Sequence, residues 1–312
     1  MISRALLLSL LLGACAAPLA PAAPPAPLAS EADLLAAEAA PLTGEEAAWN
    51  APVAPFTVIG EVHYVGMGGV SAFLITTPEG HFLLDGGLPQ SGPAVIANIE
   101  ALGFRISDVK SLLNSHAHYD HAGGLARLQR ASGARLAASE GDRDEIERGY
   151  VDYGPSAGVR FPPVRVDRVI GDGDTLSLGG VVLTAHLTPG HTEGCTSWSM
   201  ETRGADGAPR RVFFHCSATV AGHTLVPPDY PGIVENYRAG FARVRGIEAD
   251  VFLANHGVFF DLEQRRARRI AGDADAFVDP GALQRFNAAL EAAFEAELAR
   301  RSAGASSGGD GD

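Results

Sequence analysis

The chain has 312 residues, of which 46% are hydrophobic and 20% are charged, and its formal net charge is −13. This composition is typical of a globular chain with an ample core, and the length accommodates one α/β catalytic domain of about 200 to 250 residues together with tails. The acidic balance argues against nucleic acid as a partner, because phosphate binding needs clustered Lys and Arg side chains.

Residues 1–15 are typical of an export signal. A short basic start that includes Arg4 is followed by an apolar run at residues 5–12, which is too brief to span a bilayer. The run ends in Leu-Gly-Ala-Cys, which resembles a bacterial lipoprotein box with Cys15 as the lipidated residue. Ordinary cleavage within the Ala-rich stretch that follows is the alternative. Both interpretations predict a periplasmic protein, anchored to a membrane in the first case and soluble in the second.

Composition divides the rest of the chain into three parts. Residues 16–48 are dominated by Ala, Pro and Glu, and we expect a tether or a partly ordered arm there. Residues 49–301 are predicted to form the catalytic domain. Residues 302–312 are mostly Ser, Gly and Asp with nothing to bury, so this tail is predicted to be disordered.

Within the predicted domain, β-type runs alternate with amphipathic helices. The first half contains a predicted helix at residues 91–102 and strands at 57–65, 70–76, 82–84 and 109–113. The second half contains a predicted helix at residues 234–244 and strands at 181–185, 196–200, 211–214 and 251–254. Two such halves predict a sandwich of two sheets flanked by helices.

The last helix is predicted to begin at Asp279 and Pro280, with the Asp as its cap. Its apolar residues fall on one stripe, which we expect to dock on a sheet: Leu283, Phe286, Leu290, Phe294 and Leu298.

Residues 116–121, His-Ala-His-Tyr-Asp-His, place four possible metal ligands within six positions directly after the strand at 109–113. His116 and His118 stand at i and i+2, so in an extended segment both imidazoles lie on the same side and can reach one ion. Asp120 and His121 fall where the chain turns into a helix, and adjacent residues there point in different directions. The pattern therefore favours a second ion beside the first.

His191 and His256 are the candidates for completing these sites, because a catalytic zinc needs three protein ligands and an open position. Considered alone, each would be an ordinary loop histidine. Each follows a predicted strand, however, and the carboxyl ends of strands are where open α/β sheets place ligands. Their matching placement favours a shared site.

Four motifs in chain order resemble the metallo-β-lactamase superfamily, namely Leu83–Gly87, His116–His121, Pro189–Thr192 and His256. The resemblance covers roughly residues 49–300 and, within the superfamily, is most similar to the subclass B3 β-lactamases. It implies an α/β fold of the αββα type, with two mixed β-sheets flanked by helices, and two zinc ions per chain. The implied ligands are His116, His118 and His191 for the first ion and Asp120, His121 and His256 for the second.

Two departures from other branches support subclass B3. His121 stands where subclass B1 enzymes commonly carry Arg. The segment at residues 213–217 lacks the bridging Asp that glyoxalase-like and lactonase-like members have there.

The resemblance implies hydrolysis of the β-lactam amide bond, carbapenems included, by a zinc-bound hydroxide without a covalent intermediate. Asp120 would also orient the hydroxide, and Asp85 would support a ligand histidine. Ser217 and Thr219 would contact the substrate carboxylate. His223 would either donate a hydrogen bond to the developing oxyanion or face solvent. The partner would be a small-molecule β-lactam, and we expect a monomer.

Cys195 and Cys216 remain once Cys15 is assigned to the signal, and an even pair in an exported protein predicts a disulfide. Cys216 could instead be a zinc ligand, as a Cys near this position is in subclass B1. Aligning Ser217 with the subclass B3 serine puts Cys216 on the opposite side of the strand, which favours the disulfide.

Other interpretations stay open. The same fold could hydrolyse a lactone, a thioester or a phosphodiester, because fold alone does not decide substrate. A non-catalytic zinc-binding periplasmic protein is a further alternative. Tyr150, Tyr153 and Phe161 lie in a Gly- and Pro-punctuated loop that either borders the pocket or simply packs.

Overall fold

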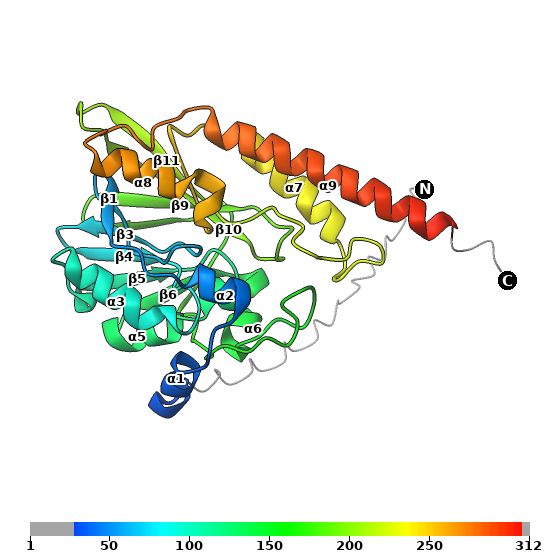
Figure 1. The fold of residues 1–312 in the computed structure, drawn as a ribbon, viewed down its shortest axis with the longest axis horizontal. Helices are drawn as coiled ribbons and strands as arrows, with labels where there is room; N and C mark the ends of the chain where they lie inside the picture. Colours follow the sequence, from blue (N-terminus) through cyan, green and yellow to red (C-terminus); the bar gives the residue numbers. More distant parts are fainter. Residues whose placement is uncertain (1–27, 308–312) are drawn as a thin grey trace, which may run out of the picture.

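The computed structural model describes residues 28–307, and Figure 1 shows two β-sheets packed face to face with helices on both outer sides. Both sheets contain parallel and antiparallel pairs. The predicted αββα sandwich of two mixed sheets is therefore confirmed. Within the described residues, no helix is long and apolar enough to cross a membrane.

The first sheet follows the order of the sequence: β1 (Phe56–Ile59), β2 (Val62–Tyr64), β3 (Phe73–Thr77), β4 (Gly80–Leu84), β5 (Val109–Leu113), β6 (Arg135–Ser139) and β7 (Arg168–Ile170). Strand β4 shows why both faces are covered. Leu83 packs with the outer helices, while Phe82 and Leu84 point into the core between the sheets. The outer helices are α3 (Ser91–Ala101), α5 (Leu125–Ser132) and α6 (Glu140–Arg148).

The second sheet has the order β12 (Val251–Ala254), β11 (Pro209–His215), β10 (Thr196–Arg203), β9 (Val181–Leu187) and β8 (Thr175–Leu178). It faces the first sheet across a core that includes Trp198 and the edge-to-face pair Phe73 and Phe214, with ring centroids 5.2 Å apart. Its outer helices are α7 (Ile233–Arg245), α8 (Leu262–Ile270) and α9 (Ala282–Ser307).

The predicted strand at 57–65 is in fact the hairpin of β1 and β2, broken at Gly60. Gly60 has a φ of +48°, and a Cβ there would lie 2.0 Å from Thr202 Oγ1. The backbone can turn at this position only because the residue lacks a side chain.

Helix α9 differs from the prediction in three respects. It begins at Ala282 rather than at Pro280. Its stripe docks only partly on the sheet, since Leu283 packs in the core between the sheets whereas Phe294 packs on Tyr237 and Phe241 of α7.

Helix α9 also continues to Ser307, so the predicted disordered tail from residue 302 begins too early. The physical reason is that extending an existing helix orders only one residue for each added hydrogen bond. Residues 308–312 lie outside the described part of the chain.

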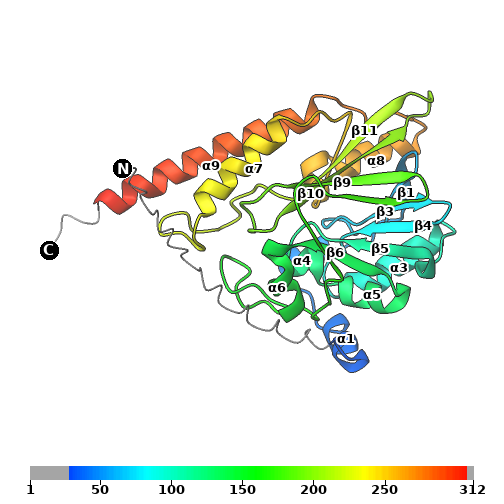
Figure 2. The same cartoon turned by 180° about the vertical axis from the view of Figure 1, so that it is seen from behind.

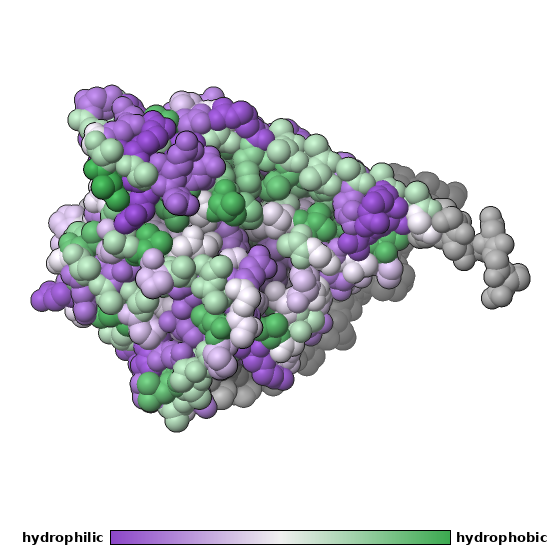
Figure 3. Space-filling view, viewed as in Figure 1, coloured by the Kyte–Doolittle hydropathy of each residue, from purple (hydrophilic) through white to green (hydrophobic). Residues whose placement is uncertain are grey.

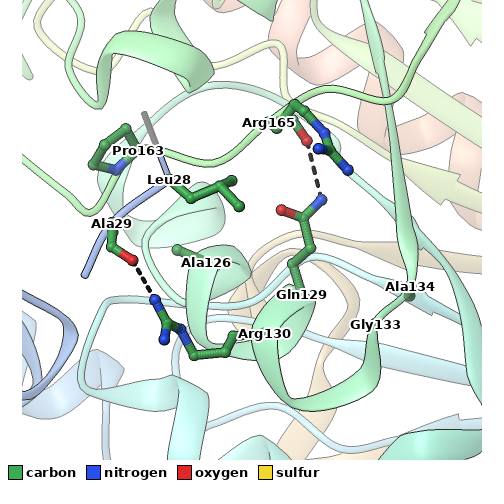
Figure 4. Close-up of a pocket in the computed structure, with 9 residues that line it drawn as sticks. All are labelled: Leu28, Ala29, Ala126, Gln129, Arg130, Gly133, Ala134, Pro163 and Arg165. Atoms are coloured by element: carbon green, nitrogen blue, oxygen red, sulfur yellow. Dashed lines mark hydrogen bonds between the residues drawn. The ribbon is translucent and has the colours of Figure 1, made fainter. Parts of the chain in front are cut away.

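The arm is ordered from residue 28 onward and carries α1 (Glu31–Glu38) and α2 (Gly44–Trp49). A capping box at Ser30 starts α1, and Arg127 of α5 pairs with Glu31 and Glu38. Figure 4 shows the start of the arm on α5, where Arg130 donates a hydrogen bond to the Ala29 carbonyl. Residues 16–27 of the predicted arm and the predicted export signal, including Cys15, lie outside the described residues.

Candidate metal centre

All six expected ligands gather at one edge of the sandwich, where strands of both sheets end. His116 and His118 follow β5, and Asp120 and His121 lie in the short helix α4 (Tyr119–Ala122), which Figure 2 shows beside the sheets near α6. From the second sheet, His191 follows β9 and His256 follows β12.

His116, His118 and His191 form the first set, with candidate ligand atoms within 4.8 Å of one another and all three residues buried. Burial lowers the pKa of each imidazole, that of His118 to about 3, so all three are neutral and able to coordinate a cation. The Nε2 atom of His116 is buried with no hydrogen-bond partner in the described residues. A buried nitrogen of this kind fits a metal ligand.

Asp120, His121 and His256 form the second set. Asp120 Oδ2 lies 3.0 Å from His121 Nε2 and 3.4 Å from His256 Nε2, and the two nitrogens are 3.2 Å apart. Ligands about 2.0 to 2.2 Å from a tetrahedral zinc lie roughly 3.3 to 3.6 Å from one another. The spacing therefore fits one ion at the centre of the three atoms.

The charge state of Asp120 also fits a metal ion at the second set. Burial alone would raise the pKa of Asp120, but the charges and hydrogen bonds of His121 and His256 hold it well below its usual range. Asp120 is therefore an ionised ligand. Candidate ligand atoms of His116, Asp120 and His121 also lie within 4.8 Å of one another, so the two sets adjoin.

Three ligand histidines use one ring nitrogen for an outer partner, which leaves the other nitrogen for a metal. His116 Nδ1 lies 3.1 Å from Ser115 Oγ. His191 Nδ1 lies 2.9 Å from the Thr219 carbonyl, and His256 Nδ1 lies 3.1 Å from the Gly69 carbonyl.

Asp85, for which a supporting role is predicted, lies between the segment that precedes His116 and the second set. Its Oδ1 accepts hydrogen bonds from the Ser115 amide (2.7 Å) and the Asn114 side chain (3.2 Å), and its Oδ2 lies 3.9 Å from His121 Nδ1. Burial raises its pKa to about 6. Asp85 thus links the segment before the ligands to the second set.

Asp142 of α6 is a supporting residue that the sequence analysis missed. This buried carboxylate accepts hydrogen bonds from the Ala117 amide (3.0 Å), the Thr192 hydroxyl (2.9 Å) and the Gly194 amide (2.9 Å). It therefore joins the His116–His118 segment to the His191 loop, and burial raises its pKa to about 7. No sequence signal marks it, because an Asp in the first turn of a charged helix is ordinary.

Cys195 and Cys216 are joined in a disulfide with Cα atoms 5.9 Å apart, which confirms the predicted bridge. Cys216 Sγ lies 3.6 Å from His116 Nδ1, so the bridge packs directly behind the first set. Because the metal ligand would be a thiolate, a bridged Cys216 does not serve as one.

A cavity of about 510 Å³ opens over both sets. The predicted domain supplies the ligands His118, Asp120, His191 and His256, the loop residues Pro155, Ser156 and Val159, and also Tyr119, Thr219, Ala221, Val258 and Phe259. Helix α2 supplies Glu45, from the predicted arm, and Trp49, the first residue of the predicted domain, and the sequence analysis placed neither in the site. Figure 3 shows the same side of the molecule as Figure 1, with small apolar patches separated by hydrophilic residues.

The three predicted substrate contacts lie beside the first set. Ser217 Oγ is 3.3 Å from Thr219 Oγ1, and Thr219 lines the cavity. His223 is buried, with Nδ1 3.0 Å from Asp229 Oδ2, so the solvent-facing alternative is wrong. Its Nε2 has no hydrogen-bond partner among residues 28–307.

The aromatic residues of the 150–161 loop turn out to pack. Phe161 belongs to the core under the outer helices, and the ring of Tyr153 contacts those of His223 and Tyr230. Neighbouring residues of the loop, rather than these rings, border the cavity.

Comparison with known proteins agrees with this geometry. A model described as the metallo-beta-lactamase superfamily matches residues 65–204. A metallo-β-lactamase of Cronobacter sakazakii with a HARLDQ motif is 43% identical, over 83% of this chain and 100% of that one, with a TM-score of 0.79. BJP-1, a subclass B3 metallo-β-lactamase of Bradyrhizobium japonicum, is 40% identical over 82% and 98% of the two chains, with a TM-score of 0.78.

FEZ-1 from Legionella gormanii, also a metallo-β-lactamase, is 34% identical over 81% of this chain and 98% of that one, with a TM-score of 0.78. The chain therefore belongs to the metallo-β-lactamase superfamily, and its structural neighbours are subclass B3 enzymes. It is a hydrolase fold with a candidate centre for divalent metal.

Curated relatives match over shorter stretches. A probable metallo-hydrolase of Burkholderia pseudomallei is 32% identical over 157 residues, and the chain spans about half (49%) of its length. A hydroxyacylglutathione hydrolase of Hyphomonas neptunium is 31% identical over 99 residues, which is 31% of that protein. These partial matches place thioester hydrolases among the relatives without assigning a substrate to this chain.

Proposed function

We propose that the chain is a β-lactamase that uses two zinc ions to hydrolyse the amide bond of penicillins, cephalosporins and carbapenems. The observation that carries the proposal is the convergence of six ligand side chains into two adjoining sets of three. Likeness to subclass B3 enzymes over nearly their whole length supports the β-lactam as substrate, whereas the likeness to thioester hydrolases is confined to about a third of those proteins.

The residues divide the chemistry between them. Bound zinc would lower the pKa of a coordinated water and polarise the scissile carbonyl. Asp120, ionised between His121 and His256, is placed to accept a hydrogen bond from the attacking water and so to orient it. The hydroxyls of Ser217 and Thr219 are placed to hold the carboxylate next to the ring nitrogen of a β-lactam.

His223 is the candidate donor to the developing oxyanion. Asp229 engages its Nδ1, which leaves Nε2 unpaired near His191, the two rings being 5.4 Å apart. The Asp229 carboxylate favours the neutral tautomer of His223 that carries its proton on Nδ1. His223 can therefore donate a hydrogen bond from Nε2 only when the ring carries a second proton.

The test is a panel of β-lactams beside an acyl-homoserine lactone and a glutathione thioester, assayed with counted zinc. We expect β-lactam hydrolysis that chelators abolish and that inhibitors acylating an active-site serine leave intact. Ser217→Ala should mainly raise KM, because its contact is made equally in ground and transition states. Efficient thioester or lactone cleavage with every β-lactam left intact would contradict the proposed substrate.

We also propose that the protein is exported to the periplasm, and the disulfide is the structural support, because such bonds persist in oxidising compartments. Mass analysis of the mature amino terminus separates the two forms of this proposal. Acyl chains on Cys15 and fractionation with membranes would establish the lipoprotein, and a soluble chain that begins beyond Cys15 would exclude it.

A further inference from the structure

The turn at Gly68 and Gly69 orients His256, a ligand of the second set. The Gly69 carbonyl lies 3.1 Å from His256 Nδ1 and also accepts a hydrogen bond from the Gly257 amide at 3.2 Å. Val70 pairs with His256 in an isolated antiparallel bridge. With Nδ1 engaged in this way, Nε2 of His256 is directed at Asp120 and His121.

The arm holds the other side of the same turn. The Gly69 amide donates to the Trp49 carbonyl at 2.9 Å, and the Gly68 amide donates to the Ala51 carbonyl at 2.7 Å. A Cβ on Gly69 would lie 2.6 Å from both Cα and Cδ1 of Trp49, so only a glycine fits this close to Trp49. The Trp49 ring also packs on the His256 ring, with centroids 5.4 Å apart.

The arm is itself anchored on both sides of Trp49. Ser91 Oγ donates to Asn50 Oδ1 at 2.6 Å, and the Gln90 side chain donates to the Ala40 carbonyl at 3.0 Å. Trp49 packs with Leu42 against a small buried cluster: Met67, Val70 and Leu88. The boundary between the predicted tether and the predicted domain is therefore fixed where it can hold the Gly68–Gly69 turn in place.

We propose that the Trp49 side chain is a positioning residue for the second metal ion, acting through the packing of its ring on the Gly69 turn and on the face of His256. The inference rests on the two metal sets of the proposed function but not on the substrate. Removing the hydrogen-bonded outer partner of a ligand histidine typically changes metal affinity about 10- to 100-fold. The Gly69 carbonyl remains in a Trp49 variant and loses only the packing beside it, so we expect an effect near the lower end of that range. Among the described residues, the ring contacts and hydrogen bonds of the first-set histidines do not involve Trp49, so the affinity of that set should not depend on the Trp49 ring.

The experiment is zinc titration of the full chain against a chelating competitor, resolving the first and second ions. Trp49→Ala, which keeps the backbone hydrogen bond to Gly69 and removes only the ring, should weaken binding of the second ion about 10-fold and leave the first within about twofold. Trp49→Phe, which retains an aromatic ring, should restore much of the loss. Leu35→Ala is the matched control, because Leu35 lies in the same arm but is 55% exposed, and it should change neither affinity.

Fluorescence supplies a readout that activity does not. The chain has two tryptophans, and subtracting the spectrum of Trp49→Phe from that of the wild type isolates the signal of Trp49. That signal should change with the second equivalent of zinc and not with the first. Thermal unfolding of the metal-free variants checks that they fold.

The outcomes separate the two proposals. A wild-type protein that binds no zinc contradicts the proposed function itself. Binding of two ions with unchanged second affinity in a folded Trp49→Ala variant, or equal weakening of both ions, contradicts only the positioning role.

Discussion

The two ligand sets lie side by side, but they are held in different ways. The first is enclosed by the domain, with His116 fully buried, the disulfide behind it and Asp142 tying its two loops together. Both sets border the cavity, but in the second the His256 side chain is 16% exposed and is fixed by a turn that hydrogen-bonds to Trp49 and Ala51. The first set is thus part of the core, while the second depends on the end of α2, at the boundary between the predicted arm and the predicted domain.

This difference teaches that two adjoining metal sites can respond separately to distant parts of the chain. Core packing is dense and changes little, so the geometry of the first set follows from the stability of the fold. The second set has a partner, α2, that can be altered without disturbing the sheets. If the two sets are separable, a change near one set should leave the ion of the other set bound.

Replacing Asp120 should have the largest effect. Asp120→Ala removes a ligand of the second set and the group that orients the attacking water, so turnover should fall by several orders of magnitude. Metal analysis should find the second ion lost and the first retained. Loss of both ions would show that the sets are not separable.

Removing the disulfide should lower the stability of the fold and should not weaken binding of the second ion in particular. Replacing both Cys195 and Cys216 by Ser opens a bridge across 21 residues and should cost about 2 to 4 kcal/mol of unfolding free energy. Denaturant unfolding of metal-free protein measures this. Any change in zinc affinity should appear in the first ion, because the bridge contacts His116; weakening confined to the second ion would contradict the comparison.

Asp142→Asn tests the tie between the two loops of the first set. The amide replaces an acceptor oxygen with a donor that faces groups which already donate, so the two loops should separate. We expect affinity for the first ion to fall about 10-fold or more, with a smaller change in the second. Thr192→Val, which removes one of the three donors, should produce a smaller loss in the same titration.

The contributions of His118, in the first set, and His121, in the second, to the pH dependence of metal-free stability should have opposite signs. Burial lowers the pKa of His118 to about 3, so the unfolded state binds more protons than the folded state, and this contribution makes stability rise between about pH 3 and 6.5. Burial opposes charge on His121, but Asp120 outweighs it and raises the His121 pKa. Its contribution is present below pH 6.5 and is lost as pH rises through the folded pKa.

Unfolding of His118→Gln below pH 6.5 and of His121→Gln above pH 6.5 measures the two contributions. Relative to the wild type, the first variant should flatten the rise in stability below pH 6.5, and the second should remove a fall in stability above it. Slopes that shift in the same direction would contradict the assignment.

The sequence by itself determined the sandwich and the candidate metal ligands. Strand patterns placed β3, β5 and β12 to within about three residues, and His116–His121 is a local motif whose spacing already carries its geometry. His191 and His256 were found because each follows a strand end. Strands β6, β7 and β8 were not predicted. Strand β6 contains two Ala residues, which have little strand propensity, while β7 and β8 are brief and partly exposed and so carry little hydrophobic pattern.

Only the tertiary structure decided what holds the ligands. The partners of His191 and His256 are the backbone carbonyls of Thr219 and Gly69, and every residue has a carbonyl, so no residue type signals them. Asp142 is ordinary for the first turn of a helix until the fold buries it between two loops. Trp49 lies next to a stretch rich in Ala and Pro, and its contact with His256 spans some two hundred positions that only folding brings together. Local pattern encodes the groups that can bind a metal, but their orientation depends on contacts between residues far apart in the chain.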